Sequence, residues 1–138
     1  MTLRYLLDTV VVAEPIARRP DDALLRRLRS KAPECAIAAP VWQELLLAAE
    51  ALPAGSDGRI LLERYLQEVV RRSFPILPYD DAAAAWHARE TARRARAGSR
   101  LSRADGEIAA IAVTAGLALI TTSPKDFAGV PGLRVESW

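Results

Sequence analysis

One stretch decides the fold class of this chain: SRADGEIAAIAVTAGLALI, residues 102–120. Residues 102–115 read as a helix, and Gly116 is the kind of residue that commonly ends one. The apolar run at 117–120 that follows predicts a buried strand. Helices that alternate with buried strands are the pattern from which parallel sheets are built.

The same alternation extends over the rest of the chain. We expect strands at residues 4–7, 35–38, 74–78, 117–120 and 133–135. We expect helices that open at 20–22, at Pro40 and after the turn-rich loop 53–58, followed by helices at 80–96 and 102–115. The pattern predicts one α/β domain, residues 1–138, with a parallel sheet covered on both faces.

Composition narrows the class of protein. The chain has 138 residues, of which 51% are hydrophobic and 26% charged, as is ordinary for a globular domain. Cys35 is the only cysteine and His87 the only histidine, which excludes an internal disulfide and any mechanism that needs two histidines of one chain. No apolar run is long enough for a membrane span, and Asp8 follows too soon for a signal peptide, so we expect a cytoplasmic protein without a membrane partner. The net charge of +2 permits a nucleic-acid partner without requiring one.

Four acidic residues follow the expected strands or open the expected helices: Asp8, Glu44, Asp105 and Asp126. Because sites in open parallel sheets form outside the carboxyl ends of the strands, these side chains can converge on one rim. Carboxylates that lie close together repel one another and need a cation, and oxygen ligands favour Mg²⁺ or Mn²⁺. The chemistry indicated is phosphoryl transfer to a metal-activated water.

Each acid also has a structural interpretation. Ser102 and Asp105 have the spacing of a helix capping box, as do Ser123 and Asp126. Glu44 near the start of its helix would interact favourably with the helix dipole. Asp8 is harder to explain in this way, because an acid directly after a buried strand does not by itself stabilise a helix.

Four segments in this order resemble PIN-domain ribonucleases, specifically the VapC-type toxins of toxin–antitoxin pairs. They are YLLDT at 5–9, WQEL at 42–45, ADGEIAAIA at 104–112 and LITTSPKDF at 119–127, the last followed by VPGL at 130–133. The likeness runs nearly from end to end.

The resemblance implies a three-layer sandwich with a short parallel sheet of four to five strands flanked by helices on both faces. It implies an endoribonuclease dependent on Mg²⁺ or Mn²⁺, with RNA as substrate, a cognate antitoxin as partner and a homodimeric state. Asp8, Glu44 and Asp105 fall on the main acidic positions of the family, with Asp8 and Asp105 as metal ligands. Asp126 is our first choice for the fourth catalytic acid, with Ser123 acting through water as the alternative.

Two departures from the family pattern keep a second reading open. Val10 stands where the family usually has Asn, and Ser123 where many relatives carry Asn or Asp. A catalytically degenerate PIN domain that binds RNA or protein without cutting is therefore the alternative function. A phosphatase that uses Asp8 as nucleophile is weaker, because its usual Asp-x-Asp pattern would need an acid at position 10.

Six arginines precede or flank Asp105: Arg89, Arg93, Arg94, Arg96, Arg100 and Arg103. As a group they read as a solvated helix face, with Arg100 and Arg103 the best candidates for phosphate contacts. Glu107 is expected to be solvated or to support the site indirectly, and Cys35 to be a small buried hydrophobe. We expect the apolar stripe around Leu61 to face the core, with a dimer or antitoxin groove as the alternative.

Overall fold

The computed structural model describes residues 2–138 and contains one five-stranded parallel sheet. The strands are β1 (Tyr5–Leu7), β2 (Cys35–Ala38), β3 (Ile76–Leu77), β4 (Ala118–Ile120) and β5 (Val135–Glu136). Their order across the sheet is β3-β2-β1-β4-β5, and every neighbouring pair is parallel. The predicted fold class is confirmed, and all five expected strands are present.

Helices occupy the connections between the strands. The α-helices are α1 (Thr9–Ala13), α2 (Asp22–Lys31), α3 (Ala39–Glu50), α4 (Asp57–Tyr65), α5 (Arg71–Ser73), α6 (Asp81–Arg96) and α7 (Arg103–Ala115). Short 3₁₀ turns are η1 (Glu14–Ile16), η2 (Ala32–Glu34) and η4 (Pro124–Phe127), and η3 (Leu66–Val70) is a π-helical turn. None of the helices within residues 2–138 has the length and apolarity needed to cross a bilayer.

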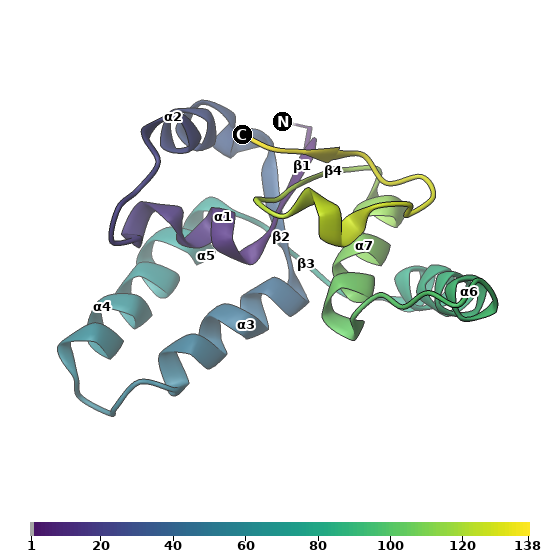
Figure 1. Cartoon of the computed structure of the whole chain (residues 1–138). Helices are drawn as coiled ribbons and strands as arrows, with labels where there is room; N and C mark the ends of the chain where they lie inside the picture. The colour runs from purple at the N-terminus through teal and green to yellow at the C-terminus, as the bar shows by residue number, and fades with distance from the viewer. Residues whose placement is uncertain (1) are drawn as a thin grey trace.

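The direction in which the chain adds strands reverses beside β1. From β1 the chain adds β2 and then β3 on one side, and it returns to add β4 on the other side of β1. Because crossover connections are right-handed, this reversal puts α1 to α5 and α6 to α7 on opposite faces of the sheet. Figure 1 shows this arrangement, with α6 and α7 on one side and the α3–α4 hairpin extending from the other. The crevice at such a reversal is where α/β proteins place their sites.

The core consists of the central strands and the helix faces that cover them. Leu6, Leu7, Ile37, Leu119 and Ile120 are fully buried in the three middle strands. These strands are continuous apolar runs because helices cover both of their faces, which is the pattern that identified them in the sequence.

The chain after β1 differs from the prediction. No helix was expected at residues 9–13, but Asp8 is the N-cap of α1 and accepts a hydrogen bond from the Thr9 amide. An acid directly after a strand therefore does stabilise a helix here. Val11 and Val12 in α1 are buried, so an apolar pair lies behind the exposed Val10.

The apolar stripe of the α4 segment was also predicted wrongly in part. The side chains of Leu66 and Val70 are fully buried, and the Tyr65 hydroxyl donates to the Val12 carbonyl. Leu61 is 62% exposed, however, so it does not face the core. The residues that pack inward are spaced by four and include Leu66 and Val70 of the π-helical turn. A search for apolar residues along one face of a regular α-helix does not anticipate such a turn.

Helix α7 begins and ends as the sequence indicated. The Ser102 hydroxyl accepts a hydrogen bond from the Asp105 amide, and Gly116 adopts φ = 71° at the C-cap, where its amide bonds carbonyls of the last turn. Helices α6 and α7 pack closely at Gly106, where an added Cβ would overlap Nε2 of His87. The His87 ring is held in place, because its Nδ1 lies 2.8 Å from the Tyr79 hydroxyl.

This close approach makes the effect of a methyl group at position 106 depend on His87. In the wild-type chain Gly106→Ala displaces a fixed ring, and we expect the free energy of unfolding to fall by about 1–3 kcal/mol. In a His87→Ala background the ring is absent, and the better helix propensity of alanine should raise the free energy of unfolding by about 0.5–1 kcal/mol. Urea denaturation of the four variants measures both changes, and the same sign in both backgrounds would contradict the contact.

Candidate active site at the sheet reversal

The Asp8 carboxylate lies between the ends of the two strands that flank the reversal. Its Oδ1 accepts the Thr9 amide at 2.8 Å, and its Oδ2 accepts the Thr121 hydroxyl at 2.8 Å. Thr121 directly follows β4 and is 1% exposed, while Asp8 directly follows β1 and bonds the Ile120 carbonyl through its own amide. Both oxygens of Asp8 are therefore oriented by groups that lie just beyond the carboxyl ends of β1 and β4.

Thr9 carries this arrangement on to α3. Its hydroxyl donates to Oε2 of Glu44 at 2.7 Å, across 35 residues of sequence. The Thr121 hydroxyl thus links the end of β4 to Asp8 at the start of α1. The Thr9 hydroxyl links the start of α1 to Glu44 in the second turn of α3. An ionised carboxylate accepts up to about four hydrogen bonds, so Asp8 and Glu44 both keep lone pairs for another ligand.

Asp105 enters the same rim from the first turn of α7. Partial burial raises the pKa of its carboxyl, and a hydrogen bond involving Ser102 opposes that effect. The negative charges of Asp8, Asp126 and Glu44 raise the pKa of Asp105 further. The four acids singled out in the sequence are therefore close enough to interact, although they come from four different elements.

The tail places Asp126 in η4 and Ser123 just before it. Asp126 is exposed, and its charge acts on Asp105. The Ser123 side chain makes no cap hydrogen bond, so the capping-box interpretation of Ser123 and Asp126 is wrong. Instead the Ser123 amide donates to the Thr121 hydroxyl, so this residue supports the Thr121–Asp8 contact through its backbone.

The chemistry of this donor set suits a hard divalent cation. None of the ion pairs formed within residues 2–138 involves Asp8, Glu44, Asp105 or Asp126, so their mutual repulsion has no cationic side chain to offset it. In the same part of the chain no group of three or more histidine, cysteine or acidic side chains is placed to hold a metal ion together. Mg²⁺ needs fewer protein ligands than that, since it is usually held by one or two carboxylates, several waters and substrate phosphates.

The basic stretch before Asp105 is not one solvated face. Glu90 is 5% exposed and accepts hydrogen bonds from both Arg93 and Arg94, which hold its pKa below the ordinary range against the effect of burial. The same guanidiniums donate to the carbonyls of Gly129 and Ala128, shortly after Asp126. The prediction of a solvated group is therefore wrong for Arg94, which is buried, whereas Arg93 stays exposed although it also pairs with Glu90. Both guanidiniums tie α6 to the tail.

The structure also shows the surroundings of Val10, Glu107 and Cys35. Val10 is 54% exposed on α1, and Asp8 is held without it. Glu107 pairs with Arg103 at 3.3 Å. Cys35 is fully buried, its thiol donates to the Lys31 carbonyl, and burial raises its pKa to about 12, so it is the inert hydrophobe that was expected.

Thr9 and Thr121 are the residues of the candidate site that the sequence did not single out. Both sit next to residues that were identified, Thr9 after Asp8 and Thr121 after the strand ending at Ile120. A hydroxyl residue beside an acid at a strand end is the signal that could have found them, but many such residues only bond water or the local backbone.

Comparisons with known proteins agree with this architecture. The family model for the PIN domain matches residues 5–133. A VapC ribonuclease, Y4jK, from Sinorhizobium fredii is 33% identical over 91% of this chain and 92% of its own length. The tRNA(fMet)-specific endonuclease VapC of Salmonella typhimurium is 26% identical over 99% of this chain and 98% of its own length. A solved member of the VapBC family of toxin–antitoxin systems, VapBC-5 from Mycobacterium tuberculosis, is 30% identical with a TM-score of 0.68, covering 99% of this chain and 96% of that one.

The raised pKa of Asp105 predicts how its removal changes stability with pH. Between the ordinary aspartate pKa and the raised folded value, the folded state binds more protons than the unfolded chain, so stability falls as the pH rises. Asp105→Asn removes the carboxyl and therefore also removes this fall in stability with rising pH. In EDTA we expect Asp105→Asn to be more stable than wild type at pH 7, with the difference vanishing below about pH 3.5, where both forms are neutral.

Chemical denaturation at both pH values measures the effect. The matched control is Glu107→Gln, which removes a carboxylate from the same helix but breaks only an exposed pair with Arg103. It should show little change, since such pairs contribute about 0–1 kcal/mol. An Asp105→Asn protein no more stable than wild type at pH 7 would show that burial and the neighbouring charges do not raise the pKa of Asp105.

Proposed function

The chain belongs to the PIN domain family, in its VapC branch, and we propose that it is a metal-dependent endoribonuclease that acts as the toxin of a toxin–antitoxin pair. The observation that carries this proposal is the set of four carboxylates without cationic partners at the sheet reversal. The names of the relatives support RNA as the substrate class and an antitoxin as the partner.

In this proposal Asp8 and Asp105 hold the metal. A bound Mg²⁺ or Mn²⁺ would neutralise charge on the scissile phosphate and lower the pKa of the attacking water. The Thr9 amide and the Thr121 hydroxyl fix the direction of the Asp8 carboxylate and leave lone pairs on both of its oxygens, which could bind the metal. Asp126 adds negative charge at the open side of the rim, from the tail that Arg93 and Arg94 anchor.

Glu44 is assigned the proton transfer. Its Oε2 accepts the Thr9 hydroxyl, which leaves Oε1 free to accept a proton from the attacking water. The water oxygen bonds to phosphorus in line with the leaving 3′-oxygen, the P–O3′ bond breaks, and the leaving oxygen takes a proton from solvent. The products are a 5′-phosphate and a 3′-hydroxyl.

Removing the charge of any of three acids should remove cleavage. Asp8→Asn, Glu44→Gln and Asp105→Asn keep the side-chain shapes, and we expect each to lower the cleavage rate at least about 100-fold while the fold persists. The assay incubates total RNA with protein and Mg²⁺ or Mn²⁺ and maps new 5′-phosphate ends by sequencing. Glu68→Gln, an exposed acid on η3, serves as the control and should cut at the wild-type rate.

A second set of variants separates positioning from chemistry. Thr9→Val removes the hydroxyl that orients Glu44 and should slow cleavage, whereas Thr9→Ser should restore it. Cleavage by all three acid-to-amide variants at the wild-type rate would sink the assignment. No cleavage by wild type with either metal would favour the alternative, a PIN domain that binds RNA or protein without cutting.

The partners in this proposal are the antitoxin and a second copy of the chain. Large exposed apolar side chains gather on α1, η1, α4 and η3: Val10, Ile16, Ile60, Leu61 and Val69. These elements lie on the side of the molecule away from α6 (Figure 1). We assign this apolar surface to the antitoxin, because large exposed apolar surfaces mark interaction sites.

A charge on this surface should break the complex selectively. We expect Leu61→Asp to abolish co-purification with the co-expressed cognate antitoxin and to leave the molar mass of the isolated chain unchanged in light scattering. Ala92→Asp adds the same charge to an exposed position of α6 and should retain the antitoxin. If Leu61→Asp instead lowers the mass of the isolated chain and keeps the antitoxin, the surface is the contact between copies.

A further inference from the structure

Three neighbouring hollows that share lining residues lead away from the carboxylate rim on the α6–α7 side, and we call them together the groove. The groove begins between the N-terminal halves of α3 and α7, where Glu44, Tyr79 and Arg103 line it. Tyr79 and Arg103 also line its next section, together with His87 and Arg100. The groove therefore connects the proposed catalytic edge with the loop between α6 and α7.

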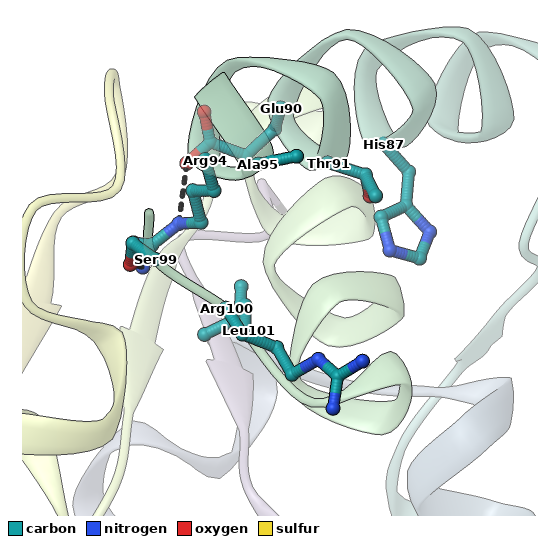
Figure 2. A pocket seen from close by; sticks show the side chains of 8 residues that line it. All are labelled: His87, Glu90, Thr91, Arg94, Ala95, Ser99, Arg100 and Leu101. Carbon is teal, nitrogen blue, oxygen red and sulfur yellow. Dashed lines mark hydrogen bonds and ion pairs between the residues drawn. The ribbon is translucent and has the colours of Figure 1, made fainter. Parts of the chain in front are cut away.

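The far end of the groove is a recess of about 230 Å³ between α6 and the loop at 99–101. Figure 2 shows its side chains: the Glu90–Arg94 pair lies at one end, and the His87 ring and the Arg100 guanidinium lie towards the other. Since Arg94 is occupied by Glu90, the positive charge that remains available at the recess comes from Arg100.

Two arginines of the groove are free to bind an anion. The Arg100 guanidinium takes part in none of the ion pairs within residues 2–138, and its side chain is exposed. The Arg103 side chain is 90% exposed and makes only a 3.3 Å contact with Glu107. Exposed pairs of this kind are weak, so a phosphate can displace Glu107 from Arg103 at little cost.

An oriented aromatic residue lies between these charges. Tyr79 is 36% exposed, and its hydroxyl is held by Nδ1 of His87 at 2.8 Å, with the two rings edge to face. The part of Tyr79 that remains exposed lines the groove. Arginines that alternate with an exposed aromatic ring are the combination by which proteins hold unpaired nucleotides.

We propose that this groove holds the single-stranded RNA segment next to the scissile phosphodiester, with Arg100 and Arg103 on its phosphates and Tyr79 stacked on a base. The inference rests on the proposed nuclease function and adds the path and strandedness of its substrate. A single strand is favoured over a duplex because a base can stack on Tyr79 only when it is unpaired.

Binding without cleavage tests the proposal. The wild-type chain in EDTA is titrated against a fluorescein-labelled single-stranded RNA of mixed sequence, about 12 nucleotides long, and the anisotropy gives Kd over about 50–200 mM salt. Each phosphate contact on a single strand contributes about 0.7 to the slope of log K against log salt. Arg100→Ala and Arg103→Ala should each reduce the slope by about this amount, which corresponds to about five-fold weaker binding near 100 mM salt.

Further variants separate stacking from charge. Tyr79→Ala should weaken binding about five-fold or more with no change in the salt slope, whereas Tyr79→Phe should bind like wild type. Arg89→Ala is the matched control, since it removes the same charge from an exposed position of α6 that does not line the groove, and it should leave Kd nearly unchanged.

Three results would overturn the groove: no binding by the wild-type chain, equal weakening by Arg89→Ala and Arg100→Ala, or a duplex of the same sequence bound as tightly as the single strand. Parallel cleavage assays with Mg²⁺ distinguish this failure from failure of the nuclease proposal. If wild type cuts RNA and the arginine variants bind normally, only the groove is wrong. If the variants lose binding as expected and wild type never cuts, only the catalytic proposal fails.

Discussion

The hydrogen bond from the Thr121 hydroxyl to the Asp8 carboxylate joins the ends of two neighbouring parallel strands, and the arrangement of the rim depends on it. It forms at the point where the strand order reverses, so helices from both faces of the sheet begin around it. Asp8 then caps α1, and the Thr9 hydroxyl of α1 donates to Glu44 of α3. The Ser123 amide donates to the Thr121 hydroxyl. A few short contacts therefore connect segments separated by more than a hundred residues.

The rim works against the stability of the fold. The pKa of Asp105 is raised first by partial burial and further by the negative charges of Asp8, Asp126 and Glu44, and none of the four acids has a cationic partner within residues 2–138. The apolar strands and the closely packed α6–α7 pair hold these charges together, because the backbone positions of the acids are set by core packing. A binding site whose charges are unbalanced in the free protein is suited to a cationic ligand, since the ligand relieves a repulsion that is already present.

Most of the fold could be predicted because its signals are local. Continuous apolar runs indicated the three middle strands, and Ser102 with Gly116 indicated both ends of α7. The acids could be named because each follows a strand or opens a helix. The contacts that orient them could not, because the Thr9–Glu44 and Thr121–Asp8 bonds cross 35 and 113 residues. Burial of Glu90 likewise depends on the tail that packs against α6, which is why the buried Arg94 was assigned to solvent.

The most direct test of the account is a count of metal ions bound by the carboxylate rim. Mn²⁺ is titrated into the wild-type chain and into Asp8→Asn, and the electron paramagnetic resonance signal of free Mn²⁺ reports how much is bound. The account predicts saturable binding by the wild-type chain that Asp8→Asn abolishes or greatly weakens, with no change in circular dichroism. Equal binding by both proteins, or none by either, would contradict the claim that these four acids form a cation site.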